Sequence, residues 1–133
     1  MYILALGGGL AAISGAQTES PVVAVSGPNN LISRLTYDPI LSKEDINEFV
    51  FNIIPDRDPV PRIDDVGRLF QKVECRAPIN NPLECHYAKR TLCEIMYQCG
   101  SGGRPLFCFC KDYGYPTPIA TGNRTFDEAC PSA

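Results

Sequence analysis

Two side chains in this sequence are candidates for acid–base chemistry: the carboxylate of Asp58 and the imidazole of His86. His86 is the only histidine among the 133 residues. A carboxylate that accepts a hydrogen bond from one ring nitrogen fixes the tautomer of the imidazole and leaves the other nitrogen to take a proton. The pair therefore predicts a general base of the kind that activates a nucleophile in acyl transfer.

Asp58 must be positioned by the segment that precedes it. The run Phe49–Ile54 is β-branched and aromatic, with Asn52 as its only polar residue, and it ends at Pro55. This composition predicts a short buried strand. The prolines that follow predict a stiff loop over residues 56–62. Because open α/β sheets place reactive groups past the carboxyl ends of their strands, Asp58 is expected at that edge.

Asp58 allows two other interpretations. The first is that Asp58 is only the first residue of an Asp-Pro turn. The second is a calcium loop, because Asp56 and Asp58 have the alternating spacing of one. However, Pro61 stands where such a loop needs glycine, and no glutamate occupies the twelfth position. Calcium is therefore excluded, and no metal site or cofactor is predicted.

His86 is expected to lie in a loop that a disulfide closes. The segment between Cys75 and Cys85 is rich in proline and asparagine, and a Cys75–Cys85 bond is predicted because such a stretch favours a return of the chain. After His86, apolar residues recur at helical spacing over 88–99, and Gly100 stands where a C-cap glycine belongs.

Residues 1–16 allow two interpretations. Their apolar centre and the small residues Ser14-Gly15-Ala16 suit a signal peptide with its cleavage site. Alternatively, Tyr2–Leu4 forms a strand, the glycines form a sharp turn, and a helix begins near Gly8. The second arrangement has the geometry of a nucleophile elbow, in which a strand, a tight turn and a helix present a serine.

The middle of the chain supplies further elements of an α/β domain. Residues 21–26 predict a second strand, closed by a Gly-Pro-Asn-Asn loop. Ser42 has the spacing of a capping box and predicts a short helix through Asn47. Residues 66–73 predict a short helix or strand. The expected core contacts of that segment are Leu69, Phe70 and Val73.

Composition limits the class of protein. The net charge of −3 and the lack of a basic run exclude nucleic acid as a partner. No apolar run reaches the roughly 18 residues that a transmembrane segment needs. Seven cysteines between Cys75 and Cys130 predict disulfides and a secreted or otherwise oxidising location, with one thiol left over. Zinc is the weaker alternative, because the sequence has no Cys-x-x-Cys.

Two segments resemble class 3 (fungal-type) triacylglycerol lipases. The stretch Asn52-Ile-Ile-Pro-Asp-Arg-Asp58-Pro-Val-Pro-Arg62 resembles the lipase segment that carries the triad aspartate, where an asparagine precedes Asp-x-Val-Pro-Arg. The stretch Leu6-Gly-Gly-Gly-Leu-Ala-Ala12 resembles the small and apolar residues that follow the nucleophilic serine. Aligned in this way, Ala5 stands at the position of that serine.

The resemblance implies an α/β class and a partial α/β-hydrolase fold over residues 1–100, with a disulfide-tied, irregular tail over 101–133. It implies the triad order Ala5, Asp58, His86, with the backbone of Leu6 as one oxyanion donor. It also implies a lipid ester as the substrate of the intact family. The family's oxyanion loop, first strands and lid helix would all precede Ala5, so a truncated or inactive copy is expected.

Three functions therefore remain open from the sequence. The first is carboxylic ester hydrolysis, as in the intact family. The second is a non-catalytic secreted domain of the same fold that binds a lipid or a protein. The third disregards the resemblance and describes a small cysteine-rich secreted binding protein, with residues 1–16 as signal peptide and a mature start near Gln17.

Overall fold

The computed structural model describes residues 2–99 and 107–113, and its core is a parallel sheet with strand order β1-β2-β3-β4. The strands are β1 (Tyr2–Leu4), β2 (Val22–Val25), β3 (Val50–Pro55) and β4 (Leu69–Val73). The helices are α1 (Ala5–Gln17), α2 (Lys43–Phe49) and α3 (Ala88–Cys99). Short 3-10 helices span Ser33–Thr36, Val60–Arg62, Pro82–His86 and Cys108–Tyr113. The expected α/β class is confirmed.

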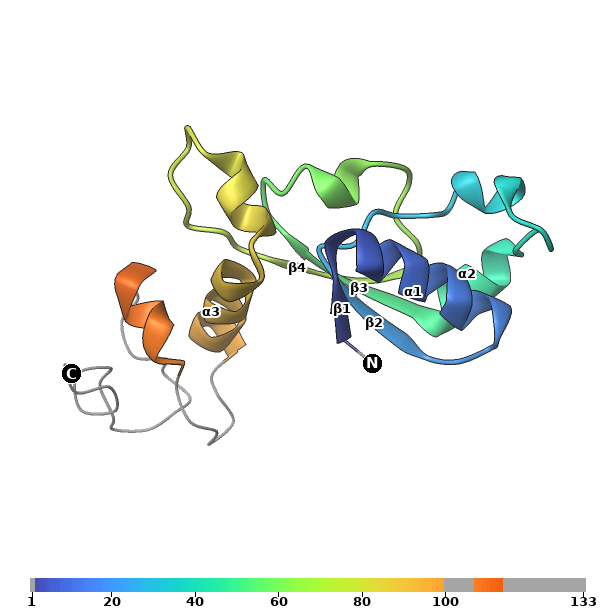
Figure 1. Cartoon of the computed structure of the whole chain (residues 1–133), viewed down its shortest axis with the longest axis horizontal. Coiled ribbons are helices and arrows are strands. Elements are labelled where there is room, and N and C mark those ends of the chain that lie inside the picture. Colours follow the sequence, from blue (N-terminus) through green and yellow to red (C-terminus); the bar gives the residue numbers. More distant parts are fainter. Residues whose placement is uncertain (1, 100–106, 114–133) are drawn as a thin grey trace.

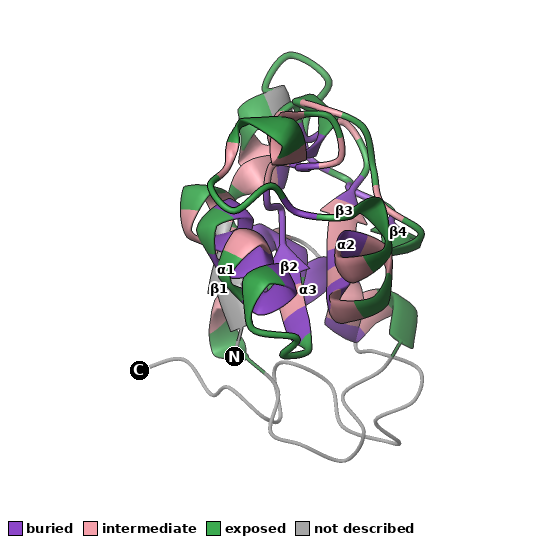
Figure 2. Ribbon diagram, turned by 90° about the vertical axis from the view of Figure 1, so that its right-hand side faces the viewer, coloured by how far each residue is buried: buried purple, intermediate pink, exposed green. Residues whose placement is uncertain are grey.

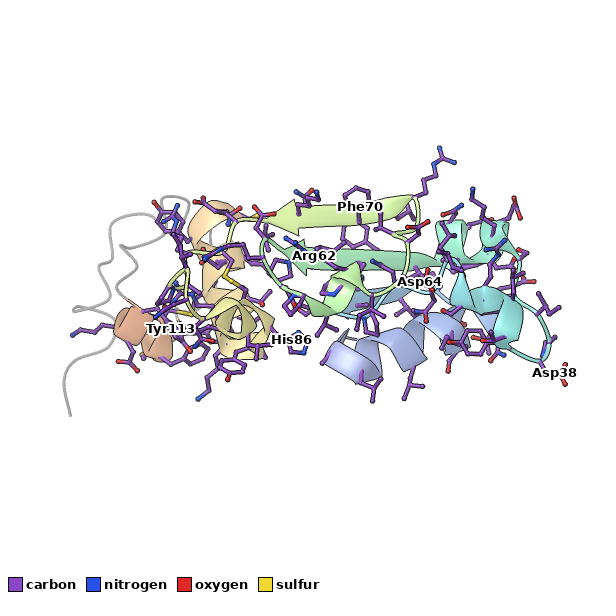
Figure 3. The ribbon with its side chains drawn as sticks, turned by 90° about the horizontal axis from the view of Figure 1, so that it is seen from above. Asp38, Arg62, Asp64, Phe70, His86 and Tyr113 are labelled. Carbon is purple, nitrogen blue, oxygen red and sulfur yellow. A yellow bond between two sulfur atoms is a disulfide. The ribbon has the colours of Figure 1, made fainter. Side chains whose placement is uncertain are left out.

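The helices α1 and α2 lie side by side on one face of the sheet (Figure 1). The main apolar core lies between α1, α2 and the strands. Its buried members are Ala12, Ala16, Leu41, Ile46 and Val50. Figure 2 shows this buried layer between the two helices and the central strands. The third helix, α3, lies beyond the carboxyl ends of β3 and β4 (Figures 1 and 3).

Several element boundaries differ from the expected ones. The first helix begins at Ala5, directly after β1, rather than near Gly8. The helix capped by Ser42 continues to Phe49, so β3 starts at Val50. The predicted capping box is confirmed, because Ser42 Oγ accepts from the Asp45 N–H and Asp45 Oδ2 accepts from the Ser42 N–H.

The expected burial of β4 is partly wrong. Val73 is 3% exposed, but Leu69 and Phe70 are 38% and 40% exposed. The reason is topological. β4 pairs only with β3 among the described residues, and as an edge strand it is covered less than β2 and β3.

The predicted Cys75–Cys85 disulfide is confirmed. A second disulfide joins Cys93 of α3 to Cys110, and so ties the described part of the tail to the domain. Cys99 is an exposed free thiol. The predicted C-cap at Gly100 lies outside the described residues.

Within the described part of the chain, no helix has both the length and the apolar character that crossing a bilayer requires.

The close approach of α1 to β2 depends on Gly15. A Cβ built on Gly15 would lie 2.4 Å from Val22 Cγ2 and 2.8 Å from the Ser20 carbonyl oxygen. Real Cβ atoms do not come so close, so α1 can occupy this place only with glycine there.

We therefore expect Gly15→Ala to lower the free energy of unfolding. Overpacking usually costs about 1–3 kcal/mol, and the roughly 1 kcal/mol that alanine gains over glycine in helix propensity offsets part of this cost, so the expected net loss is up to about 2 kcal/mol. Equilibrium denaturation measures the difference. Gly67→Ala is the matched control, because its added methyl group would lie 3.4 Å from its nearest neighbour. An unfolding free energy for Gly15→Ala equal to that of the wild type would contradict the close contact.

Candidate active site

The candidate site lies at the carboxyl edge of the sheet, where three strands end in strained turns. Ala5 follows β1 directly and has a φ of 55°. Ser26 follows β2 with a φ of 54°, and Arg57 follows β3 by two residues with a φ of 68°. Such left-handed conformations cost non-glycine residues on the order of 1–2 kcal/mol each and cluster at functional sites. Two other residues, Glu19 before β2 and Asp64 before β4, also have a positive φ, so the strain is compatible with a site at this edge but does not identify it alone.

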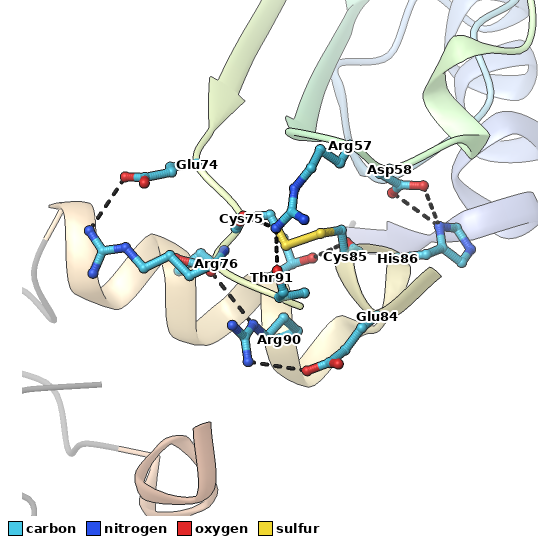
Figure 4. The surroundings of a disulfide bond; sticks show 12 residues. Arg57, Asp58, Glu74, Cys75, Arg76, Glu84, Cys85, His86, Arg90 and Thr91 are labelled. Atoms are coloured by element: carbon cyan, nitrogen blue, oxygen red, sulfur yellow. Dashed lines mark hydrogen bonds and ion pairs between the residues drawn. A yellow bond between two sulfur atoms is a disulfide. The ribbon is translucent and has the colours of Figure 1, made fainter. Parts of the chain in front are cut away.

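The structure brings Asp58 and His86 into contact, although they are far apart in the chain. His86 Nδ1 lies 3.2 Å from Asp58 Oδ1 and 3.1 Å from Asp58 Oδ2 (Figure 4). The Asp58 side chain is fully buried, while that of His86 is 20% exposed. With the Nδ1–H donating to the carboxylate, Nε2 of the neutral ring is the nitrogen that can accept a proton.

His86 is positioned by the disulfide and by Arg57. Cys85, the residue before it, is fully buried and bonded to Cys75 at the end of β4. Arg57 donates to the carbonyl oxygens of Cys75, at 2.6 Å, and of Ala77 (Figure 4). The loop that carries the imidazole is thus fastened to the loop that carries Asp58.

Asp58 is positioned by hydrogen bonds within its own loop. Its backbone N–H donates to the Pro55 carbonyl oxygen at 3.2 Å, and its Oδ1 accepts from the Val60 N–H at 2.9 Å. These two hydrogen bonds, together with the prolines of the loop, restrict the conformation of the segment that carries Asp58.

Two buried asparagines join the loops after β2 and β3. Asn29 donates from its side chain to the Pro61 carbonyl oxygen and from its backbone to that of Ile63. Asn52 Nδ2 donates to Asn29 Oδ1 at 3.1 Å and to the Gly27 carbonyl oxygen at 3.0 Å. The single polar residue of the predicted strand thus anchors the loop of the neighbouring strand.

Asp64 makes a second connection between these loops. Its two carboxylate oxygens accept from the backbone N–H groups of Ile32 and Ser33, each at 2.7 Å. Partial burial opposes ionisation, but hydrogen bonds from the Ser33 side chain and from the backbone N–H groups outweigh it and hold the pKa of Asp64 below its ordinary value.

Sequence reasoning did not identify three of these residues: Asn29, Arg57 and Asp64. For Asn52 a signal existed, because it is the only polar residue in an apolar strand. Asp64 had none, since an exposed pair of aspartates is typical of any surface loop. Leu6, the expected oxyanion donor, is the second residue of α1, and its side chain is exposed.

The described residues contain no group of three or more His, Cys, Asp or Glu placed to hold a metal ion. The chain matches no protein-family model, no curated protein and no solved structure. The fold and the site therefore define a structural class only: a small parallel α/β domain with an Asp–His pair at the carboxyl edge of its sheet.

We expect Asp64→Asn to destabilise the protein at neutral pH by on the order of 1 kcal/mol, because a capping carboxylate is replaced by a weaker acceptor. The folded pKa of Asp64 lies below its unfolded value, so its contribution is fully present above about pH 4 and is lost as the pH falls through the folded pKa. Denaturation at several pH values should show the difference from the wild type shrinking in acid. Asp65→Asn is the control, since only the backbone of Asp65 contributes to this cluster. A pH-independent difference would contradict the assignment.

Proposed function

We propose that this chain is an α/β domain of the carboxylic ester hydrolase type, similar to class 3 lipases, in which Asp58 and His86 form the acid–base pair and Ala5 occupies the nucleophile position. The observation that carries the proposal is the contact between His86 Nδ1 and the buried Asp58 carboxylate. In the lipase plan these groups are the second and third members of a triad.

The position of Ala5 supports the same proposal. It has a left-handed φ between a strand and a helix, as the nucleophile of an elbow does. His86 points toward the N-terminal end of α1 (Figures 3 and 4). A hydroxyl at position 5 would pass its proton to Nε2, and the Leu6 N–H in the first turn of α1 would donate to the developing oxyanion.

Alanine makes the chain as it stands an inactive relative. Its side chain has no oxygen, so no acyl intermediate can form at this position. Loss of the triad serine lowers turnover by on the order of 10⁶ in a well-studied serine protease. A domain that keeps its acid–base pair without its nucleophile can still bind an ester, which supports non-catalytic binding as the second candidate function.

The disulfides of the described residues are compatible with an oxidising compartment.

The third hypothesis, a cleaved signal peptide over residues 1–16, is less well supported. β1 pairs with β2, and Ala12 and Ala16 of α1 are buried in the main core. Removal of a leader that ends at Ala16 would take away a strand and most of the helix that covers the sheet.

Restoring the nucleophile tests the proposal. The wild-type chain is expected not to react with a fluorophosphonate, whereas Ala5→Ser should gain one phosphonyl group. In that step an Oγ–P bond forms, the P–F bond breaks, fluoride leaves and His86 takes the hydroxyl proton. Intact-protein mass spectrometry measures the labelling rate. Adding Asp58→Asn or His86→Gln should slow it by about 10²–10⁴, the usual worth of a general base. The proposal fails if folded Ala5→Ser reacts no faster than the wild type.

The disulfide that positions His86 gives a second prediction in the Ala5→Ser background. Replacing Cys75 and Cys85 by serine should slow labelling more than replacing Cys93 and Cys110. Both changes remove one buried bridge, but only the first releases the loop that carries the imidazole. Circular dichroism confirms that both proteins are folded. Equal rates in the two variants would show that the disulfide does not position His86.

A further inference from the structure

The side-chain amide of Asn52 is bonded at its nitrogen but not at its oxygen. Nδ2 donates to the Gly27 carbonyl oxygen at 3.0 Å and to Asn29 Oδ1 at 3.1 Å. Asn52 Oδ1 is buried and has no hydrogen-bond partner among the described residues. Leaving a buried acceptor without a partner is costly, and native proteins satisfy almost all such groups, with ordered water where no protein group can reach.

The neighbours of Asn52 fix the orientation of its amide. Asn29 Nδ2 donates to the Pro61 carbonyl oxygen, so Asn29 must present its oxygen to Asn52. Turning the Asn52 amide over would place its oxygen against two acceptors, the Gly27 carbonyl oxygen and Asn29 Oδ1. Two acceptors repel each other, so this second orientation is excluded. The atom of Asn52 that still needs a partner is therefore the oxygen, and the partner must be a donor.

A small cavity lies beside this amide, between the helices α1 and α2 and the central strands. Its volume is about 20 Å³, and most of the residues that line it are buried, among them Asn52, Ala12 of α1 and Ala24 of β2. One water molecule needs a volume of about 10–15 Å³. The cavity therefore has the size of a single water molecule and is too small for a larger ligand.

The lining of the cavity selects its occupant. Cavities that stay empty in proteins are apolar, whereas the amides of Asn29, Asn30 and Asn52 line this one. Its described lining includes no charged residue, so a cation would have no carboxylate to offset the loss of its hydration. Water can donate to Asn52 Oδ1 and to the second lone pair of Asn29 Oδ1. It can also accept from Asn30 Nδ2, whose bonds to the Pro28 and Gly9 carbonyl oxygens are long, at 3.2 and 3.5 Å.

We propose that this cavity is the binding site of one structural water molecule, held by the amides of Asn52, Asn29 and Asn30. The water completes the hydrogen bonding of Asn52 and joins β3 to the loop after β2 inside the core. Asn29 also bonds the loop of Asp58 at Pro61, so the water belongs to the network that holds that loop. The proposal does not rest on the proposed function, because its test detects water and uses no labelling of the candidate active site.

Magnetic relaxation dispersion of oxygen-17 in the solvent tests the proposal, because it detects long-lived water in a protein and does not respond to the exchange of hydroxyl protons. Ala12→Val should lose one long-lived water relative to the wild type, because the added methyl groups occupy the cavity. Ala16→Val is the matched control. Ala16 is also a buried residue of α1 in the main core, but it is not among the residues that line the cavity, so this variant should keep the water.

Circular dichroism shows whether both variants are folded. If Ala12→Val does not fold, the nuclear Overhauser effect between water and the Ala24 methyl group decides instead, and a cross-peak is expected. Tyr37→Phe is the background for this measurement, because the Tyr37 hydroxyl bonds Asn30 Oδ1 and could relay magnetisation from solvent. Absence of the cross-peak in folded Tyr37→Phe would overturn the proposal. So would equal numbers of long-lived waters in the wild type and folded Ala12→Val, or an equal loss in Ala16→Val.

Discussion

The candidate site depends on a buried carboxylate, that of Asp58. Asp58 is fully shielded from solvent, and an isolated carboxylate in such a place costs several kcal/mol. It is tolerated because His86 Nδ1 and the Val60 N–H both bond it. The chain meets this requirement by bringing a loop from beyond β4 back across the end of β3. The disulfide and Arg57 hold that loop in place.

The polar residues around Asp58 also hold its loop in place. Asn29, Asn52 and Asp64 connect the loops after β2 and β3, so the turn that carries Asp58 is fixed from two sides. Strained backbone at Ala5, Ser26 and Arg57 is compatible with a folded protein because packing and hydrogen bonds around it determine the conformation. Rigidity at this edge suits a site in which small displacements of a proton acceptor lower the rate of reaction.

The sequence predicted the parts of the fold that depend on local pattern. The apolar run ending at Pro55, the capping box at Ser42 and the helical spacing after His86 each correspond to an observed element. The proximity of Asp58 and His86 was expected from the resemblance to class 3 lipases and not from local pattern. The predicted burial of Leu69 and Phe70 was wrong, because the apolar pattern of a strand does not reveal that it lies at the edge of the sheet. The bonds of Asn29 and Asp64 were missed because they join distant loops that no local pattern relates.

The most direct test of this account is the tautomer of His86, which long-range ¹H–¹⁵N correlation spectroscopy determines at a pH where the ring is neutral. The single histidine makes the assignment unambiguous. The account predicts that the proton resides on Nδ1 and that Asp58→Asn redistributes it between the two nitrogens, because an amide can both donate and accept. A ring protonated on Nε2 in the wild-type protein, or a tautomer that Asp58→Asn leaves unchanged, would contradict the buried acid–base pair.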